Sequence, residues 1–102
     1  MIRLELLFLC GFLLFGHKSA SVTLAWDPVR DKGIVRYRIY YTDITGHRAI
    51  KARALDVGLT TRAVVPNLVA GHTYDFVVTA VNSAGRESLP SNMVKYVAAS
   101  SK

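Results

Sequence analysis

Three histidines are the first residues to consider for catalysis or metal binding: His17, His47 and His72. No two of them are four residues apart, which is the spacing that a helical zinc site needs. Neither His47 nor His72 has a serine, aspartate or cysteine at the spacing of a catalytic motif. We therefore predict that His47 and His72 are solvated loop residues, and we expect no metal, no cofactor and no nucleophilic catalysis.

Four aspartates are the candidates for acid–base chemistry: Asp27 with Asp31, and Asp43 with Asp56. Glycoside hydrolases place two carboxylates on opposite sides of a sugar-sized cleft. A chain of 102 residues that fills its core with its own side chains leaves no deep cleft for such a pair. The single cysteine, Cys10, also excludes an internal disulfide and any zinc site with several cysteines. We therefore predict that the protein is not an enzyme.

A group of basic and aromatic residues predicts a binding surface instead. Arg36, Arg38 and Tyr40 alternate with apolar residues, so a strand would place all three on one outward face. The basic residues of the following hairpin are expected to extend this strip: Arg48, Lys51 and Arg53. The net charge of +6 favours an acidic partner, and we expect a protein or an anionic polysaccharide rather than nucleic acid. The alternative is a solvent-facing sheet whose charges keep it soluble and prevent edge pairing.

The first twenty residues differ in composition from the rest of the chain. Arg3 precedes an apolar run from Leu6 to Gly16, which is shorter than the roughly 20 residues of a membrane-spanning helix. Cleavage after Ala20 would remove residues 1–20 as a signal peptide, so we predict an exported protein, secreted or periplasmic. Three alternatives stay open: a membrane anchor over residues 4–16, a lipoprotein signal at Cys10, and a core helix or strand.

The elements that must position these residues read as short β-strands. Apolar residues recur at a spacing of two, and no segment of the body shows helical spacing with a capping signal. Turn-forming residues separate the apolar runs, and Pro66-Asn67 is expected to end one of them. The predicted strands cover residues 22–26, 37–41, 49–57, 60–65, 73–81 and 93–97. Six short strands with such turns predict an all-β, antiparallel sandwich.

The order of these strands resembles a fibronectin type III domain of the variety common in secreted bacterial proteins. The matching segments are VTLAWDP (22–28), YRIYYTD (37–43) and PNLVAGHTYDFVVTAVNSAGRESLPSN (66–92). Trp26 falls on strand B, where this family keeps its core tryptophan, whereas immunoglobulin domains place theirs on strand C beside a disulfide. The resemblance implies an immunoglobulin-like sandwich over residues 21–98, followed by a C-terminal tail over residues 99–102.

The resemblance also implies which residues form the core. Leu68 and Tyr74 match a tyrosine corner, in which the hydroxyl of a tyrosine at the start of strand F bonds to upstream backbone. The residues expected to stabilise the fold are Trp26, Tyr37, Ile39, Leu68, Tyr74, Phe76 and Val78.

Strand A is the one element without an obvious match. Either this variety lacks it, or residues 13–20 are retained and pair beside strand B. Without strand A, the edge of strand B is open and could accept a strand from a partner.

The resemblance implies a non-catalytic binding or spacer module at the cell exterior, in which Arg36, Arg38 and Tyr40 are the predicted ligand contacts. The alternatives are a module tethered to the membrane by its N-terminal segment, and an accessory carbohydrate-binding domain of a hydrolase system. The F–G loop carries Gly85-Arg86-Glu87 and no Arg-Gly-Asp, so integrin binding is not expected and we predict an ordinary polar turn.

Overall fold

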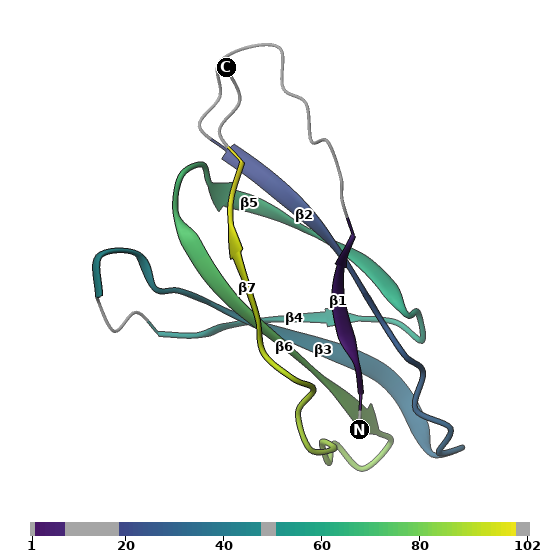
Figure 1. Ribbon diagram of the computed structural model, residues 1–102. Helices are drawn as coiled ribbons and strands as arrows, with labels where there is room; N and C mark the ends of the chain where they lie inside the picture. Colours follow the sequence, from purple (N-terminus) through teal and green to yellow (C-terminus); the bar gives the residue numbers. More distant parts are fainter. Residues whose placement is uncertain (1, 8–18, 48–50, 100–102) are drawn as a thin grey trace.

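Seven β-strands of the described residues form two antiparallel sheets (Figure 1). The computed structural model describes residues 2–7, 19–47 and 51–99. One sheet has the strand order β1-β2-β5, and the other has the order β4-β3-β6-β7. The strands are β1 (Leu4–Leu7), β2 (Ser19–Trp26), β3 (Ile34–Asp43), β4 (Arg53–Val57), β5 (Arg62–Val69), β6 (Thr73–Asn82) and β7 (Val94–Val97). This arrangement confirms the predicted all-β antiparallel sandwich.

The space between the sheets is filled by side chains from alternate strand positions. The rings of Trp26 on β2 and Tyr37 on β3 lie 5.5 Å apart between centroids, so this aromatic pair joins the two sheets directly. Tyr41 stacks on Phe76 at 6.0 Å within the four-stranded sheet. The seven side chains assigned to the core from the sequence are each no more than 5% exposed: Trp26, Tyr37, Ile39, Leu68, Tyr74, Phe76 and Val78. Burial of one such side chain stabilises the fold by about 1.5–3 kcal/mol.

Strand β5 continues past the point where the sequence predicted its end. Pro66 and Asn67 lie within β5, and the register passes from Val22↔Val65 to Ala20↔Leu68. Ser21 of β2 therefore faces both Pro66 and Asn67, which is the two-against-one arrangement of a β-bulge. Asn67 has a φ of 60°, and β5 is the outermost strand of its sheet. Proline is tolerated at a bulge of an edge strand because its missing N–H removes no essential ladder bond.

A strand does occupy the position beside β2, and it is formed by Leu4–Leu7 rather than by residues 13–20. β1 pairs with β2 from Leu4↔Trp26 to Leu7↔Thr23, and Ile2 and Leu4 are 3% and 2% exposed. Residues 19 and 20 belong to β2 itself, so they do not form a separate strand beside it, and residues 13–18 lie outside the described part of the chain. Of the predicted signal segment, Leu4–Leu7 forms a strand of the sandwich, and residues 8–18 lie outside the described part of the chain. Within the described ranges the structure contains no apolar helix long enough to cross a membrane.

The outer side of β1 is held by one side chain from a distant part of the sequence. The backbone N–H of Leu4 donates to Asn92 Oδ1 at 2.9 Å, and Asn92 Nδ2 donates to the carbonyl oxygen of Leu4 at 3.4 Å. An amide side chain carries the same donor and acceptor pair as a peptide group. Asn92 therefore substitutes for a neighbouring strand at this position and positions Leu4 to fill the core.

Two buried tyrosines fasten loops to the sandwich. The hydroxyl of Tyr74 accepts a hydrogen bond from the backbone N–H of Val69 at 2.9 Å, which forms the corner between β5 and β6. The hydroxyl of Tyr37 accepts from the N–H of Val29 at 2.8 Å in the loop between β2 and β3. A buried phenol thus satisfies a backbone N–H at the last residue of β5 in the first case, and one in a loop in the second.

We expect Tyr74→Phe to lower the free energy of unfolding by about 1–3 kcal/mol, because the N–H of Val69 loses its acceptor in a partly buried position. Equilibrium denaturation with urea measures the change. Tyr96→Phe is the matched control: Tyr96 also packs against the core, and its hydroxyl forms no hydrogen bond to a described residue. Equal denaturation midpoints for Tyr74→Phe and the unmodified chain would contradict the role of the corner.

We expect Asn92→Ala in the full chain to release β1 before the rest of the fold unfolds. The loss of two hydrogen bonds to Leu4 should cost about 1–2 kcal/mol locally. Amide hydrogen exchange measured by NMR should then accelerate at Leu4, while exchange at Val78 in the centre of β6 changes much less. Unchanged exchange at Leu4 would show that β2 alone holds the strand.

Candidate functional site

The outer face of the four-stranded sheet carries the three predicted contact residues. Arg36, Arg38 and Tyr40 alternate on β3 with the buried Tyr37 and Ile39, so they point away from the core. β3 lies between β4 and β6, with Arg38 opposite Asp56 on one side and Thr79 on the other. The structure thus brings the three residues together on one face, as the strand period requires.

Arg38 is the centre of an ion-pair network on this face. Its guanidinium meets Asp56 through two bonds, from Nε to Oδ1 and from Nη2 to Oδ2, in the forked geometry that arginine forms with carboxylates. Its Nη1 also lies 3.2 Å from Glu87 Oε2. Arg36 Nε approaches the same Asp56 at 3.7 Å.

Tyr40 belongs to the same network through Glu87. Its hydroxyl donates to Glu87 Oε1 at 2.7 Å, and the hydroxyl of Thr79 donates to the same oxygen at 2.8 Å. Glu87 is held in place because it forms a β-bridge with Val81 at the end of β6. Glu87 is therefore a structural element of this face, and the loop containing it is more than the ordinary polar turn that its sequence predicted.

These contacts neutralise the predicted basic strip. Two arginines face two carboxylates, and the charges cancel within the set formed by Arg36, Arg38, Asp56 and Glu87. The hydroxyls of Tyr40 and Thr79 lower the pKa of Glu87, and the hydrogen bond from Arg38 lowers the pKa of Asp56. The hydrogen bond to Asp56 in turn raises the pKa of Arg38. An acidic ligand would have to displace these internal partners to bind here.

Lys51 and Arg53 do not extend this strip, contrary to the prediction. Arg53 pairs with Tyr41 across the β3–β4 ladder. It lies on the same face of β4 as Leu55 and Val57, and both of these residues pack against the core. The strand period therefore places Arg53 on the opposite face from Asp56. Arg48 lies outside the described residues.

Lys51 and Arg53 instead border a partly enclosed hollow between the sheets. The hollow has a volume of about 240 Å³ and lies where β4 and β5, the outermost strands of the two sheets, leave the sandwich open. The residues that line it come from both sheets: Tyr41, Asp43, Lys51, Arg53, Asn67, Val69 and Tyr74. Sequence reasoning missed this site because its lining depends on how the two sheets meet.

His72 and Asp43 form a pair that the sequence did not predict. His72 Nδ1 lies 2.6 Å from Asp43 Oδ2, and the N–H of Thr45 donates to Asp43 Oδ1 at 3.0 Å. Burial raises the pKa of Asp43, but the hydrogen bonds from Thr45 and His72 outweigh it, so the pKa lies below its usual value. The sequence predicted that His72 is a solvated loop residue, whereas the structure pairs it with a carboxylate. This pair connects the end of β3 to the start of β6.

The other candidates for chemistry have structural roles or no described partner. Asp31 accepts a hydrogen bond from the N–H of Gly33 at 2.9 Å within the loop before β3. Asp56 is bound to arginines on the outer face, while Asp43 lies at the hollow, so these two carboxylates do not face one cleft. His17 lies outside the described residues. Across the described ranges, no three His, Cys, Asp or Glu side chains gather as metal ligands would.

The sequence profile described as "Fibronectin type III domain" matches residues 15–95, which is most of the chain. The chain belongs to the fibronectin type III family. Solved fibronectin type III domains share its fold. The third such domain of the human KIAA0343 protein is 25% identical with a TM-score of 0.72, and the match covers 81% of this chain and 74% of that one. The three-domain fragment FN1–FN3 of chicken CNTN1 is 21% identical with a TM-score of 0.75, covering 94% and 30% of the two chains.

One curated relative is similar to this chain over a small part of its own length. This chain is 39% identical over 82 residues to the Kelch domain-containing protein SSO1033 of Saccharolobus solfataricus. The match covers 80% of this chain and 10% of that protein, so the chain spans about a tenth of the relative's length. Fibronectin type III domains are generally non-catalytic binding or spacer modules, and they commonly mediate protein binding.

We expect Glu87→Gln to change the pH dependence of stability. The pKa of Glu87 is lower in the folded chain than in the unfolded chain, so its contribution is complete above the unfolded value of about 4.3 and disappears as pH falls through the folded value. Denaturation at a series of pH values measures the free energy of unfolding of the unmodified chain and of Glu87→Gln. The difference between these two free energies should shrink as the pH falls from about 5 to about 3.

Tyr40→Phe provides the matched test of the cause. This variant keeps the carboxylate of Glu87 but removes the Tyr40 hydroxyl, which lowers the pKa of Glu87 most. The free energy of unfolding of Tyr40→Phe should therefore depend less on pH between about pH 5 and pH 3 than that of the unmodified chain. A Glu87→Gln effect that stayed constant across this pH range would show that the carboxylate charge plays no part.

Proposed function

We propose that this chain is an exported, non-catalytic fibronectin type III module that acts as a binding or spacer unit at the cell exterior. The observation that carries the proposal is the filled interior. The aromatic and aliphatic side chains of both sheets occupy the core, and Phe76, Leu24 and Ile39 are among those that are fully buried. Function is therefore left to the surface and to the shallow openings between the sheets.

The composition of the N-terminal segment supports export. Arg3 followed by the apolar run from Leu6 to Gly16 and by small residues near Ala20 matches the three parts of a secretory signal. Removal of residues 1–20 would also take away β1 together with Ile2 and Leu4. The alternative is a retained segment over residues 4–16 that anchors the module to the membrane.

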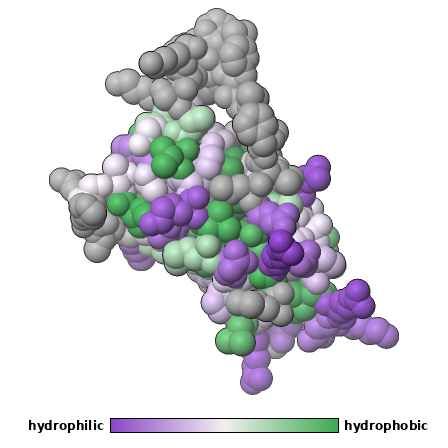
Figure 2. All heavy atoms as spheres, in the orientation of Figure 1, coloured by the Kyte–Doolittle hydropathy of each residue, from purple (hydrophilic) through white to green (hydrophobic). Residues whose placement is uncertain are grey.

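A partner on the outside of the cell fits the charge of the chain. The predicted mature chain carries an excess of basic residues, which favours an acidic protein surface or an anionic polysaccharide. The internally paired Arg36, Arg38 and Tyr40 do not favour this contact. The basic residues at the hollow, Lys51 and Arg53, are the better candidates. Figure 2 shows hydrophilic and hydrophobic residues interspersed over the visible face.

Mass spectrometry of the chain recovered from the cell exterior or periplasm tests export. We expect the mass of residues 21–102, because cleavage after Ala20 removes the segment before it. Leu9→Arg with Leu13→Arg should abolish export, since charges within the apolar run disrupt a signal. Recovery of the full-length chain in detergent extracts of membranes would support the anchored alternative and contradict the secreted form.

A further inference from the structure

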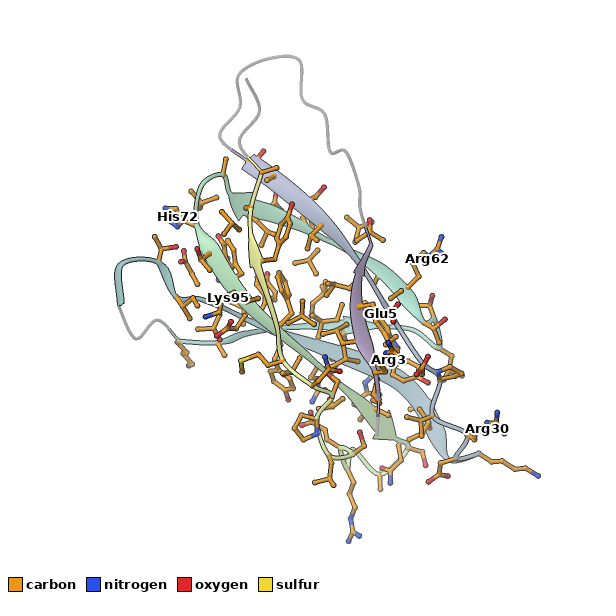
Figure 3. The ribbon with its side chains drawn as sticks, in the orientation of Figure 1. Arg3, Glu5, Arg30, Arg62, His72 and Lys95 are labelled. Atoms are coloured by element: carbon orange, nitrogen blue, oxygen red, sulfur yellow. The ribbon has the colours of Figure 1, made fainter. Side chains whose placement is uncertain are left out.

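We propose that the hollow between β4 and β5 binds a carboxylated sugar unit of an anionic polysaccharide. The proposal rests on the proposed binding function and deepens it by assigning a site and a ligand class. The hollow lies on the side of the molecule that His72 marks in Figure 3. Four strands contribute to its lining, so the backbone of both sheets fixes its shape.

The positive charges at this hollow are available for a ligand. Lys51 and Arg53 are exposed, and neither forms an ion pair with any residue of the described ranges. Arg36 and Arg38, in contrast, are occupied by Asp56 and Glu87. A carboxylate that enters the hollow therefore meets two cations without first breaking an ion pair to another described residue.

The size of the hollow limits what can enter it. Sites for drug-sized ligands have volumes of about 300–1,000 Å³, and this hollow has about 240 Å³. It therefore admits a single ring-sized group, while the remainder of a longer ligand would lie across the surface. Partial enclosure also reduces solvent screening, so a carboxylate bound inside interacts more strongly than one on an open face.

The remaining polar groups favour a sugar over other anions. Asp43 lies at the hollow as a fixed acceptor, because Thr45 and His72 bind its two oxygens and leave further lone pairs free. Asn67, exposed at the β-bulge, provides an amide donor and an acceptor. A hydroxylated ring can donate to Asp43 while its carboxylate meets Lys51 and Arg53. A ligand that carries both hydroxyls and a carboxylate uses both features of this lining, whereas an acidic peptide side chain carries no hydroxyl and would leave the acceptor unused.

Isothermal titration with tetragalacturonate tests the proposal on the full chain. We expect binding that persists at about 0.5 M salt, where ionic contacts on an open surface are screened within about 4 Å. Neutral galactotetraose, which lacks the carboxylates, should bind at least about ten-fold more weakly. Lys51→Ala with Arg53→Ala should reduce tetragalacturonate affinity by at least about ten-fold.

Arg30→Ala with Arg62→Ala is the matched control. It also removes two positive charges, but on the side of the molecule away from His72 (Figure 3). Its affinity for tetragalacturonate should stay within about two-fold of the unmodified chain. Thermal denaturation of both double variants verifies that they remain folded.

Three results would overturn the assignment. The first is no binding of tetragalacturonate by the unmodified chain. The second is equal weakening by both double variants, which indicates general charge attraction. The third is tighter binding of an Asp-rich peptide than of tetragalacturonate, which indicates a protein partner. Each of these leaves the export measurement unaffected, so failure of the site is distinguishable from failure of the proposed function.

Discussion

The two sheets are joined without a disulfide, because a chain with one cysteine cannot form an internal one. Side-chain packing connects them, together with hydrogen bonds such as that from Val69 on β5 to Tyr74 on β6. The contact between Trp26 and Tyr37 connects β2 of one sheet with β3 of the other. Tyr37 also accepts a hydrogen bond from Val29, so the same ring that joins the sheets fixes the loop between these two strands. The orientation of β3, and with it the outer face and the hollow, depends on this pair.

The strand period was sufficient to predict most of this fold. Trp26, Ile39, Phe76 and Val78 could be assigned to the core because a spacing of two residues places them on the buried face of any strand. The end of β5 could not be predicted, since Pro66 is a reliable strand breaker except at a bulge of an edge strand. Neither the bulge nor the edge position is visible before the pairing of β5 with β2 is known.

The candidate site was predictable only in part, for the same reason. The period correctly placed Arg36, Arg38 and Tyr40 on one outward face, but it could not show that Glu87, nearly fifty residues later, neutralises them. The position of Asp56 opposite Arg38 requires the register of the β3–β4 hairpin. Arg53 shares the face of Leu55 and Val57, which pack against the core, and a basic residue on that face gives no sign of bordering a hollow until the positions of both sheets are known.

Asn92 links the two ends of the polypeptide. By holding Leu4, it ties the first strand to the segment that leads into β7, so a folded molecule buries Ile2 and Leu4 at the start of the proposed export signal. A secretion apparatus can bind such a signal only while the segment is accessible, before it packs into the sandwich. If residues 1–20 do serve as a leader, the order of events during synthesis decides where the protein goes: a molecule captured by the apparatus leaves the cytoplasm, and one that collapses first stays behind.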